Sequence, residues 1–178
     1  LHLTWHHYEV VDTIGYYSVE YASSTDDGDS WDLQSIHAPA SGDWSWFPTI
    51  ATYENKVVVV WQDDGDWDGD GTYDFDIVVV ISEDNGESWG ETELIFDSDT
   101  YSFAYMLPSV AAFDGFIYVS FQELTDGVYD HYFASSQDHG SSWSESHKIT
   151  NGHLLNYAKM GIAIEEKPES KHKTYFGY

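Results

Sequence analysis

The sequence predicts an all-β protein made of about three β-propeller blades, each with four antiparallel strands. Uninterrupted β-branched runs, a long internal repeat and a turn motif present in three copies support this fold class. The runs 57–61 and 77–81 are apolar at every position, which is typical of strands covered on both faces. A blade stacked between two neighbouring blades provides such cover, whereas a sheet with one solvated face does not.

The turn motif has the form S-x-D-x-G-x-S-W, and its copies begin 58 and then 54 residues apart. Segment 47–51 matches 107–111, and 57–62 matches 116–122, so the repeat extends well beyond the motif. Each copy follows a strand-like run and precedes a shorter one, which gives four strands in about 55 residues, a length typical of propeller blades. The central residues of the motif are Ser24, Asp26, Gly28 and Trp31, then Ser82, Asp84, Gly86 and Trp89, then Ser136, Asp138, Gly140 and Trp143.

The phase of the repeat predicts approximate blades at 1–46, 47–106 and 107–156, with 157–178 starting a further blade. Residues 1–5 align with the second strand of a blade, so the first blade begins one strand late. Propellers close with about four to eight blades, more than this chain supplies. We therefore expect either a partial propeller within a longer chain or a homo-oligomer, such as half of a six-bladed ring.

The residue types of the motif suit a tight turn. Its Asp can accept hydrogen bonds from turn N–H groups, its Gly can adopt a positive φ, and its Ser and Trp can cap and cover the loop. A nucleophilic serine would need a histidine at constant spacing, yet only the third copy has one, His139. We therefore expect the motif to be structural and predict no catalytic residue.

The repeated S-x-D-x-G-x-x-W pattern resembles the Asp-box, or BNR, repeat of sialidases and related β-propellers, and it covers most of the chain. The resemblance implies a sialidase-like propeller whose Asp boxes lie away from the catalytic face. Sialidases bind the substrate carboxylate with three arginines, but this sequence contains no arginine. These residues therefore cannot build a complete sialidase site, whereas a glycoside hydrolase that works through two carboxylates stays open.

Residues 66–74 read D-x-D-G-D-G-x-x-D and resemble the calcium loops of EF-hand, dockerin and FG-GAP proteins. Ile77 stands where an EF-hand has its final glutamate, so the FG-GAP-like form within a β-hairpin fits better. A plain acidic turn without a metal is the alternative. The resemblance implies Ca²⁺ held by the side chains of Asp66, Asp68, Asp70 and Asp74 and by the carbonyl of Thr72.

In an up-and-down blade, the predicted calcium loop lies at the edge opposite the Asp boxes, together with the loops between blades. Aromatic residues recur in those inter-blade loops, and flat rings suit the apolar faces of sugars. Packing between blades or against another subunit is the alternative role. Since Trp44 and Trp46 alternate in sequence, we expect them to point in opposite directions. The candidate ligand-binding residues are Trp44, Trp46, Tyr101 and Tyr105.

The charge and composition exclude several classes of function. With 32 Asp and Glu against 6 Lys, the formal net charge is -26, which repels phosphates and makes nucleic acids poor partners. No apolar run is long enough to cross a bilayer, so we expect no membrane insertion. The absence of cysteine excludes disulfides and cysteine-ligated zinc.

Together these features favour a non-catalytic, calcium-binding propeller module, extracellular or on the cell surface, that binds a glycan or a protein. Two alternatives stay open. One is a fragment of a carboxylate-dependent glycoside hydrolase. The other is a self-assembling structural subunit of a surface layer or filament.

Overall fold

A computed structural model of the chain describes residues 1–38, 44–67, 69, 71, 74–98, 106–125, 127–150, 161–165 and 173–177. In these ranges the chain forms strands joined by turns and bends, and all strand pairs within the sheets are antiparallel. The all-β prediction is confirmed. A search of the same residues for a helix able to cross a membrane finds none.

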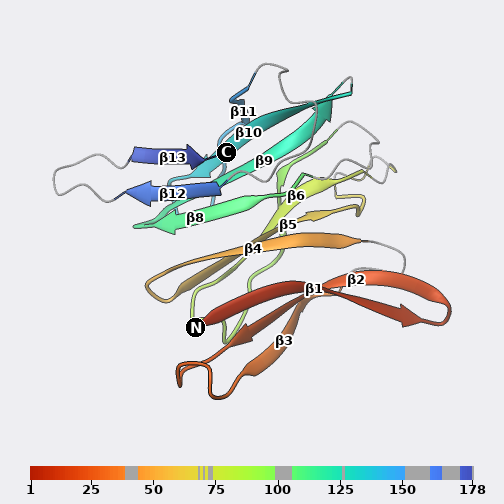
Figure 1. Cartoon of the computed structure of the whole chain (residues 1–178), viewed down its shortest axis with the longest axis vertical. Helices are drawn as coiled ribbons and strands as arrows, with labels where there is room; N and C mark the ends of the chain where they lie inside the picture. Colours follow the sequence, from red (N-terminus) through yellow and green to blue (C-terminus); the bar gives the residue numbers. More distant parts are fainter. Residues whose placement is uncertain are drawn as a thin grey trace.

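The strands form four sheets, each built from consecutive strands. Figure 1 shows them stacked side by side, from the first sheet at the bottom to the third sheet and the final hairpin at the top. The first sheet contains β1 (His2–Val11), β2 (Ile14–Ser23) and β3 (Asp32–His37). The second contains β4 (Ser45–Tyr53), β5 (Lys56–Asp63), β6 (Asp76–Ser82) and β7 (Glu93–Phe96). The third contains β8 (Ser109–Phe113), β9 (Phe116–Thr125), β10 (Val128–Ser136) and β11 (His147–Lys148), and the hairpin contains β12 (Gly161–Glu165) and β13 (Lys173–Gly177).

The hydrophobic core lies between the sheets, because successive residues of a strand point to opposite faces. One cluster joins the first and second sheets through Val19, Tyr21, Val57, Val59, Trp61, Val78 and Val80. A second cluster joins the second and third sheets through Val58, Val60, Ile77, Val79, Ile117, Val119 and Phe121, among others. Each fully buried Val or Phe contributes about 1.5–3 kcal/mol. The uninterrupted apolar run of β5 therefore serves two cores at once.

The register of the sheets shows which strands correspond to one another. In the second sheet the first serine of the Asp box, Ser82, pairs with Val57 of β5. In the first sheet the equivalent Ser24 exchanges two backbone hydrogen bonds with Leu1, of 2.7 and 2.9 Å. Hence β1 corresponds to β5, and the first sheet has no counterpart of β4 within the described residues.

The start of β4 is irregular, which shapes one edge of the stack. Pairing between β4 and β5 is interrupted between Trp46 and Thr49. Pro48 has no N–H to donate to the ladder, and Phe47 before it adopts a φ of 53°. Trp46, at this end of β4, is partly buried against the core between the second and third sheets.

Candidate functional site

The Asp boxes close three nearly identical turns between the last two strands of their sheets, β2–β3, β6–β7 and β10–β11. In the first copy the Asp26 carboxylate accepts from Ser24 Oγ at 2.8 Å, Ser30 N at 2.9 Å and Ser30 Oγ at 2.5 Å, while Gly28 N donates to Ser24 Oγ at 2.8 Å. These donors, from Ser30 first, lower the Asp26 pKa to about 2. The Asp26 carboxylate therefore accepts its hydrogen bonds from donors of its own turn. The equivalent bonds recur within 0.1 Å around Asp84 and Asp138, whose pKa values are also lowered.

The second Asp box also connects its sheet to the preceding sheet through hydrogen bonds and an aromatic contact. Gln34 of β3 accepts a hydrogen bond from Trp89 Nε1 at 3.1 Å and donates one to the carbonyl of Gly86 at 2.8 Å. Tyr21 packs edge-on against Trp89 at 4.9 Å and donates its hydroxyl to the carbonyl of Asn85 at 3.2 Å. Sequence reasoning missed Gln34 and Tyr21, because the motif carries no information on residues 50 or more positions away.

The opposite edge of the stack, which we call the loop edge, carries the loop that follows β5 and the chain that precedes β4. At its centre lies Asp63, which is 1% exposed. Its carboxylate accepts from Ser45 Oγ at 2.7 Å, Trp61 Nε1 at 2.8 Å, Trp67 Nε1 at 2.9 Å and Gly65 N at 3.1 Å. With four donors in place, this carboxylate orders the start of the loop.

His37 of the first sheet completes this network, with Nε2 at 3.4 Å from Asp63 Oδ2. Burial alone would raise the pKa of Asp63, but His37, Ser45 and Trp61 outweigh burial and hold the pKa below its ordinary value of 3.8. Asp63 is therefore ionised at neutral pH. A carboxylate whose oxygens already accept four hydrogen bonds has little capacity left for proton transfer, so we assign it a structural role.

An aromatic stack lies beside this network on the loop edge. The rings of Trp44 and Trp46 stack at 4.9 Å and 24°, and Trp46 stacks in turn on Phe75 at 5.5 Å and 23°. Tyr17 of the first sheet meets both indoles edge-on, at 6.3 and 5.4 Å. The expectation that the two tryptophans point in opposite directions is wrong, because residues two apart on a strand share a face. Both are half-buried.

Other predicted ligand-binding and calcium-binding residues fall partly outside the described ranges. Tyr101, Tyr105, Asp68, Asp70 and Thr72 lie outside them. The described residues contain no group of three or more His, Asp or Glu side chains able to hold a metal ion.

Within the predicted calcium loop, Gly69 and Gly71 have φ values of 78° and 85°, and Gly71 N donates to Asp66 Oδ1 at 3.1 Å. Both glycines are therefore in the left-handed region, and the N–H of Gly71 is hydrogen-bonded to the side chain of Asp66. Asp74 closes the segment immediately before β6, next to Phe75 of the aromatic stack.

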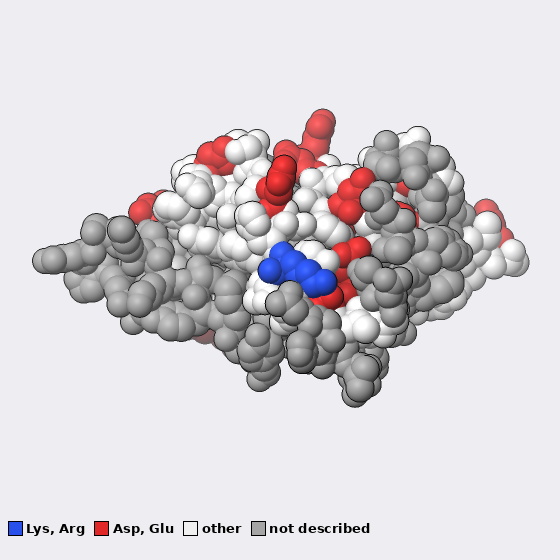
Figure 2. All heavy atoms as spheres, turned by 90° about the horizontal axis from the view of Figure 1, so that it is seen from above, with Lys and Arg blue, Asp and Glu red and all other residues white. Residues whose placement is uncertain are grey.

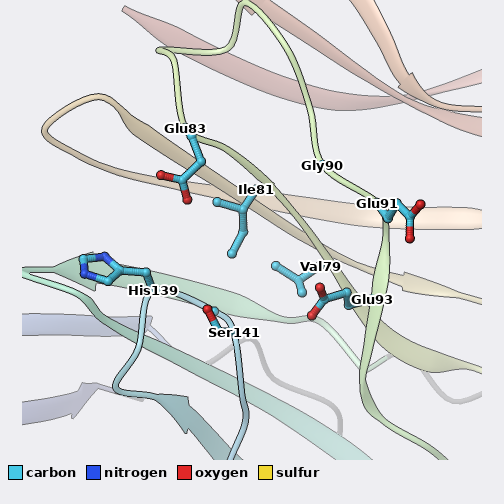
Figure 3. A pocket seen from close by; sticks show the side chains of 9 residues that line it. Val79, Ile81, Glu83, Gly90, Glu91, Glu93, His139 and Ser141 are labelled. Atoms are coloured by element: carbon cyan, nitrogen blue, oxygen red, sulfur yellow. The ribbon is translucent and has the colours of Figure 1, made fainter.

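A groove of about 220 Å³ lies on the Asp-box edge, at the seam between the second and third sheets. Figure 3 shows Glu83 and His139 on one side of it and Glu91 and Glu93 on the other, with apolar side chains between them. The carboxylates are spread along the groove and do not converge on one point. Glu83 also forms an ion pair with Lys56. No local sequence pattern indicates this groove, since it arises where two sheets meet.

The charged side chains of the described residues are dispersed over the face that Figure 2 shows. Figure 2 shows acidic side chains scattered over the visible face, with a small basic group beside some of them. One described ion pair joins Lys148 to the buried Asp130 at 2.5 Å. Among the described residues, the acidic side chains visible on this face do not gather into one site.

Comparisons with known proteins identify the fold. No family model matches the chain. Over 159 residues, 75% of the chain, it is 24% identical to a protein named sialidase from Paraclostridium sordellii. A Trypanosoma rangeli sialidase structure, in complex with 2,3-difluorosialic acid, matches 92% of the chain with a TM-score of 0.57 at 16% identity. Zg3597, a family 117 glycoside hydrolase produced by the marine bacterium Zobellia galactanivorans, matches 90% with a TM-score of 0.53 at 17% identity.

The chain spans 39% of the curated sialidase and 32% and 52% of the two solved structures. These likenesses, together with the stacked antiparallel sheets, show that the chain forms part of a sialidase-like β-propeller.

The glycine of the second Asp box permits a close approach between sheets that a side chain would prevent. A Cβ at Gly86 would lie 2.0 Å from the Tyr21 hydroxyl, whereas one at Gly28 would meet nothing nearer than 3.6 Å. Both glycines have a positive φ, of 85° and 96°. We expect Gly86→Ala to lower the free energy of unfolding by about 2–4 kcal/mol and Gly28→Ala by about 1 kcal/mol, as measured by urea denaturation. Equal losses in the free energy of unfolding for the two variants would show that the positive φ, and not the contact with Tyr21, determines the cost of the substitution.

Neutralising Asp63 tests the network on the loop edge. We expect Asp63→Asn to lower the free energy of unfolding at pH 7 by about 2–4 kcal/mol, because buried donors lose a charged acceptor. Ser45→Ala, which removes one donor, costs about 1 kcal/mol. Since the folded-state pKa is lowered, this stabilisation is present above pH 3.8 and is lost as pH falls through the folded-state pKa. Urea titrations at several pH values should therefore show the wild type and Asp63→Asn converging in acid; a constant difference would contradict the assignment.

Proposed function

We propose that this chain is a carbohydrate-binding part of a sialidase-like propeller, that it takes neutral sugars at the loop edge, and that its own residues do not hydrolyse them. The observation that carries the proposal is the stack of Trp44, Trp46 and Phe75 at the strand ends opposite the Asp boxes. Half-buried indoles held in place by neighbouring rings offer a rigid apolar surface for the C–H face of a sugar.

The polar groups around the stack support binding more than catalysis. The backbone N of Trp44 donates to Asp64, and Asp63 lies one residue away in the saturated network. In the described part of the chain the buried carboxylates are Asp63, Asp76 and Asp130. Asp76 accepts from Ser98 N at 2.9 Å, and Asp130 is paired with Lys148. Each therefore has an internal partner, whereas a glycosidase acid needs a proton it can give to the leaving group.

The absence of arginine points to the class of sugar. A carboxylate on the ligand is best bound by a planar, bidentate guanidinium, and the 178 residues contain none. The large negative charge also opposes acidic sugars. Neutral oligosaccharides therefore fit these residues better than sialylated ones, although relatives of the fold carry the name sialidase.

We propose in addition that the loop at 66–74 binds Ca²⁺ and that the protein works outside the cell or on its surface. The hydrogen bond from Gly71 N to Asp66 Oδ1 and the two positive-φ glycines support a loop that wraps around its first aspartate. Carboxylate and carbonyl oxygens are the ligands that Ca²⁺ prefers. Because Asp74 adjoins Phe75, a bound ion would also steady the end of the aromatic stack.

Binding of neutral sugars is tested by titrating the chain with lactose and other neutral oligosaccharides, in parallel with 3′-sialyllactose, using calorimetry. We expect binding of at least one neutral sugar and about tenfold weaker binding by Trp44→Ala, which removes one stacking surface.

Trp31→Ala is the matched control, since Trp31 is also half-buried but lies in an Asp box on the opposite edge. Equal weakening by both substitutions, or binding of sialyllactose alone, would contradict the proposed site. Hydrolysis of aryl glycosides by the purified chain would contradict the non-catalytic role.

Calcium binding is tested by thermal unfolding of chelator-treated protein at increasing Ca²⁺ concentration. With free Ca²⁺ at about 100 times its dissociation constant, stabilisation is about 2.7 kcal/mol, which raises Tm by about 5–10 °C in a chain of this length. Asp66→Asn should abolish most of the rise, and Asp29→Asn, an exposed acid on the opposite edge, should retain it. A Tm that does not change with Ca²⁺ would show that the loop is a plain acidic turn.

A further inference from the structure

The outer face of the first sheet carries a cluster of exposed apolar side chains. We call the side chains of Leu1, Leu3, Trp5 and Leu33 on this face the end patch. They are 60%, 51%, 37% and 68% exposed. Leu3 and Leu33 flank Ala22 on either side in the sheet register, so the patch spans all three strands. Together these side chains expose roughly a few hundred Å², the scale at which an apolar surface indicates an interaction site.

The end patch occupies positions that are buried in the other two sheets. By register, Leu1, Leu3 and Trp5 of the first sheet correspond to Val57, Val59 and Trp61 of β5. Those three residues are 1%, 0% and 0% exposed, because Val19 and Tyr21 of the preceding sheet cover them. The third sheet repeats the arrangement on β9, where the corresponding residues Ile117, Val119 and Phe121 are 2%, 0% and 1% exposed.

The Asp-box glycines show independently that the second and third sheets each contact the sheet before them, whereas the first sheet does not. A Cβ at Gly86 would strike Tyr21 of the preceding sheet at 2.0 Å, and one at Gly140 would strike Ile81 of the preceding sheet at 2.2 Å. At Gly28 of the first sheet the nearest atoms, at 3.6 Å, belong to Leu1 and Trp31 of the same sheet. The first sheet is therefore shaped for a preceding blade at two separate places, its strand face and its turn.

We propose that the end patch is an interface and that, in the 178-residue chain, a blade of a second copy covers it. The interface that repeats within the chain joins the patch-equivalent face of one sheet to the opposite face of the sheet before it. A second copy carries blades of this kind, and the far end of its stack, where β12 contacts β8 and β9, is the end that can meet the end patch. Because two different faces meet, the association is head to tail.

Charge opposes this association without preventing it. Each copy carries a formal net charge of -26, so two copies repel one another over the Debye length, while the end patch itself is apolar. Added salt should screen the repulsion and leave the apolar contact intact. Association through the end patch therefore strengthens with ionic strength, the reverse of the behaviour of an interface held by ion pairs. The inference does not depend on the proposed carbohydrate binding.

The test measures mass by light scattering on the purified chain between about 1 and 500 μM, at low and high NaCl. We expect assemblies larger than a monomer that grow with concentration and with salt. The double variant Leu3→Glu, Leu33→Glu should raise the dissociation constant about tenfold or more, since it places charges in an apolar interface. Val10→Glu is the control: Val10 lies on the same strand and is 55% exposed, but points to the other face.

A second measurement does not depend on how well the glutamate variants fold. The chain contains no cysteine, so Leu33→Cys and Val10→Cys each introduce a single thiol whose alkylation rate reports its accessibility. We expect Leu33→Cys to become protected as protein concentration rises, and Val10→Cys to react at the same rate throughout.

Four results would overturn the proposal. They are a monomer at every concentration, an assembly unaffected by Leu3→Glu and Leu33→Glu, equal disruption by Val10→Glu, and protection of Leu33→Cys that is independent of concentration. The last would mean that another part of the same molecule covers the end patch.

Discussion

The structure depends on one constraint: the central strands must be covered on both faces. Val57 and Val59 of β5 pack against the first sheet, and Val58 and Val60 between them pack against the third. A strand with this pattern cannot sit at a solvated surface without exposing apolar side chains on one side. Stacking of successive sheets satisfies the constraint, and the sialidase-like propeller is the arrangement that relatives of the fold share.

The Asp boxes have two levels of function within this stack. Within a turn, the aspartate gathers nearby N–H and hydroxyl donors, which fixes the connection between the last two strands of the sheet. Between sheets, the same turn provides a bare glycine against which a residue of the preceding sheet lies. The polar and apolar parts of the interface therefore come together at one place. The Asp box holds neighbouring sheets at a fixed distance, whereas the aromatic stack and the Asp63 network lie at the opposite edge.

Local sequence patterns predicted the sheets and turns because these depend on periodicity and on turn chemistry. The network around Asp63 could not be predicted, since His37 reaches it from another sheet and the sequence gives no register between sheets. The contact of Gln34 with Trp89 could not be predicted for the same reason. The error over Trp44 and Trp46 was of a different kind: their spacing of two already placed both rings on one face.

The first sheet has one covered face and one bare face, and this asymmetry governs how the stack comes apart. In an array whose members touch only their neighbours, an interior sheet loses two contacts on unfolding and a terminal sheet loses one. Within the described chain, the first sheet (β1–β3) and the β12–β13 hairpin are both terminal units, so we expect local opening to start at these ends, including the bare face of the first sheet. A partner that covers the bare face of the first sheet, from the same molecule or another, therefore raises the free-energy barrier to unfolding of the sheets behind it.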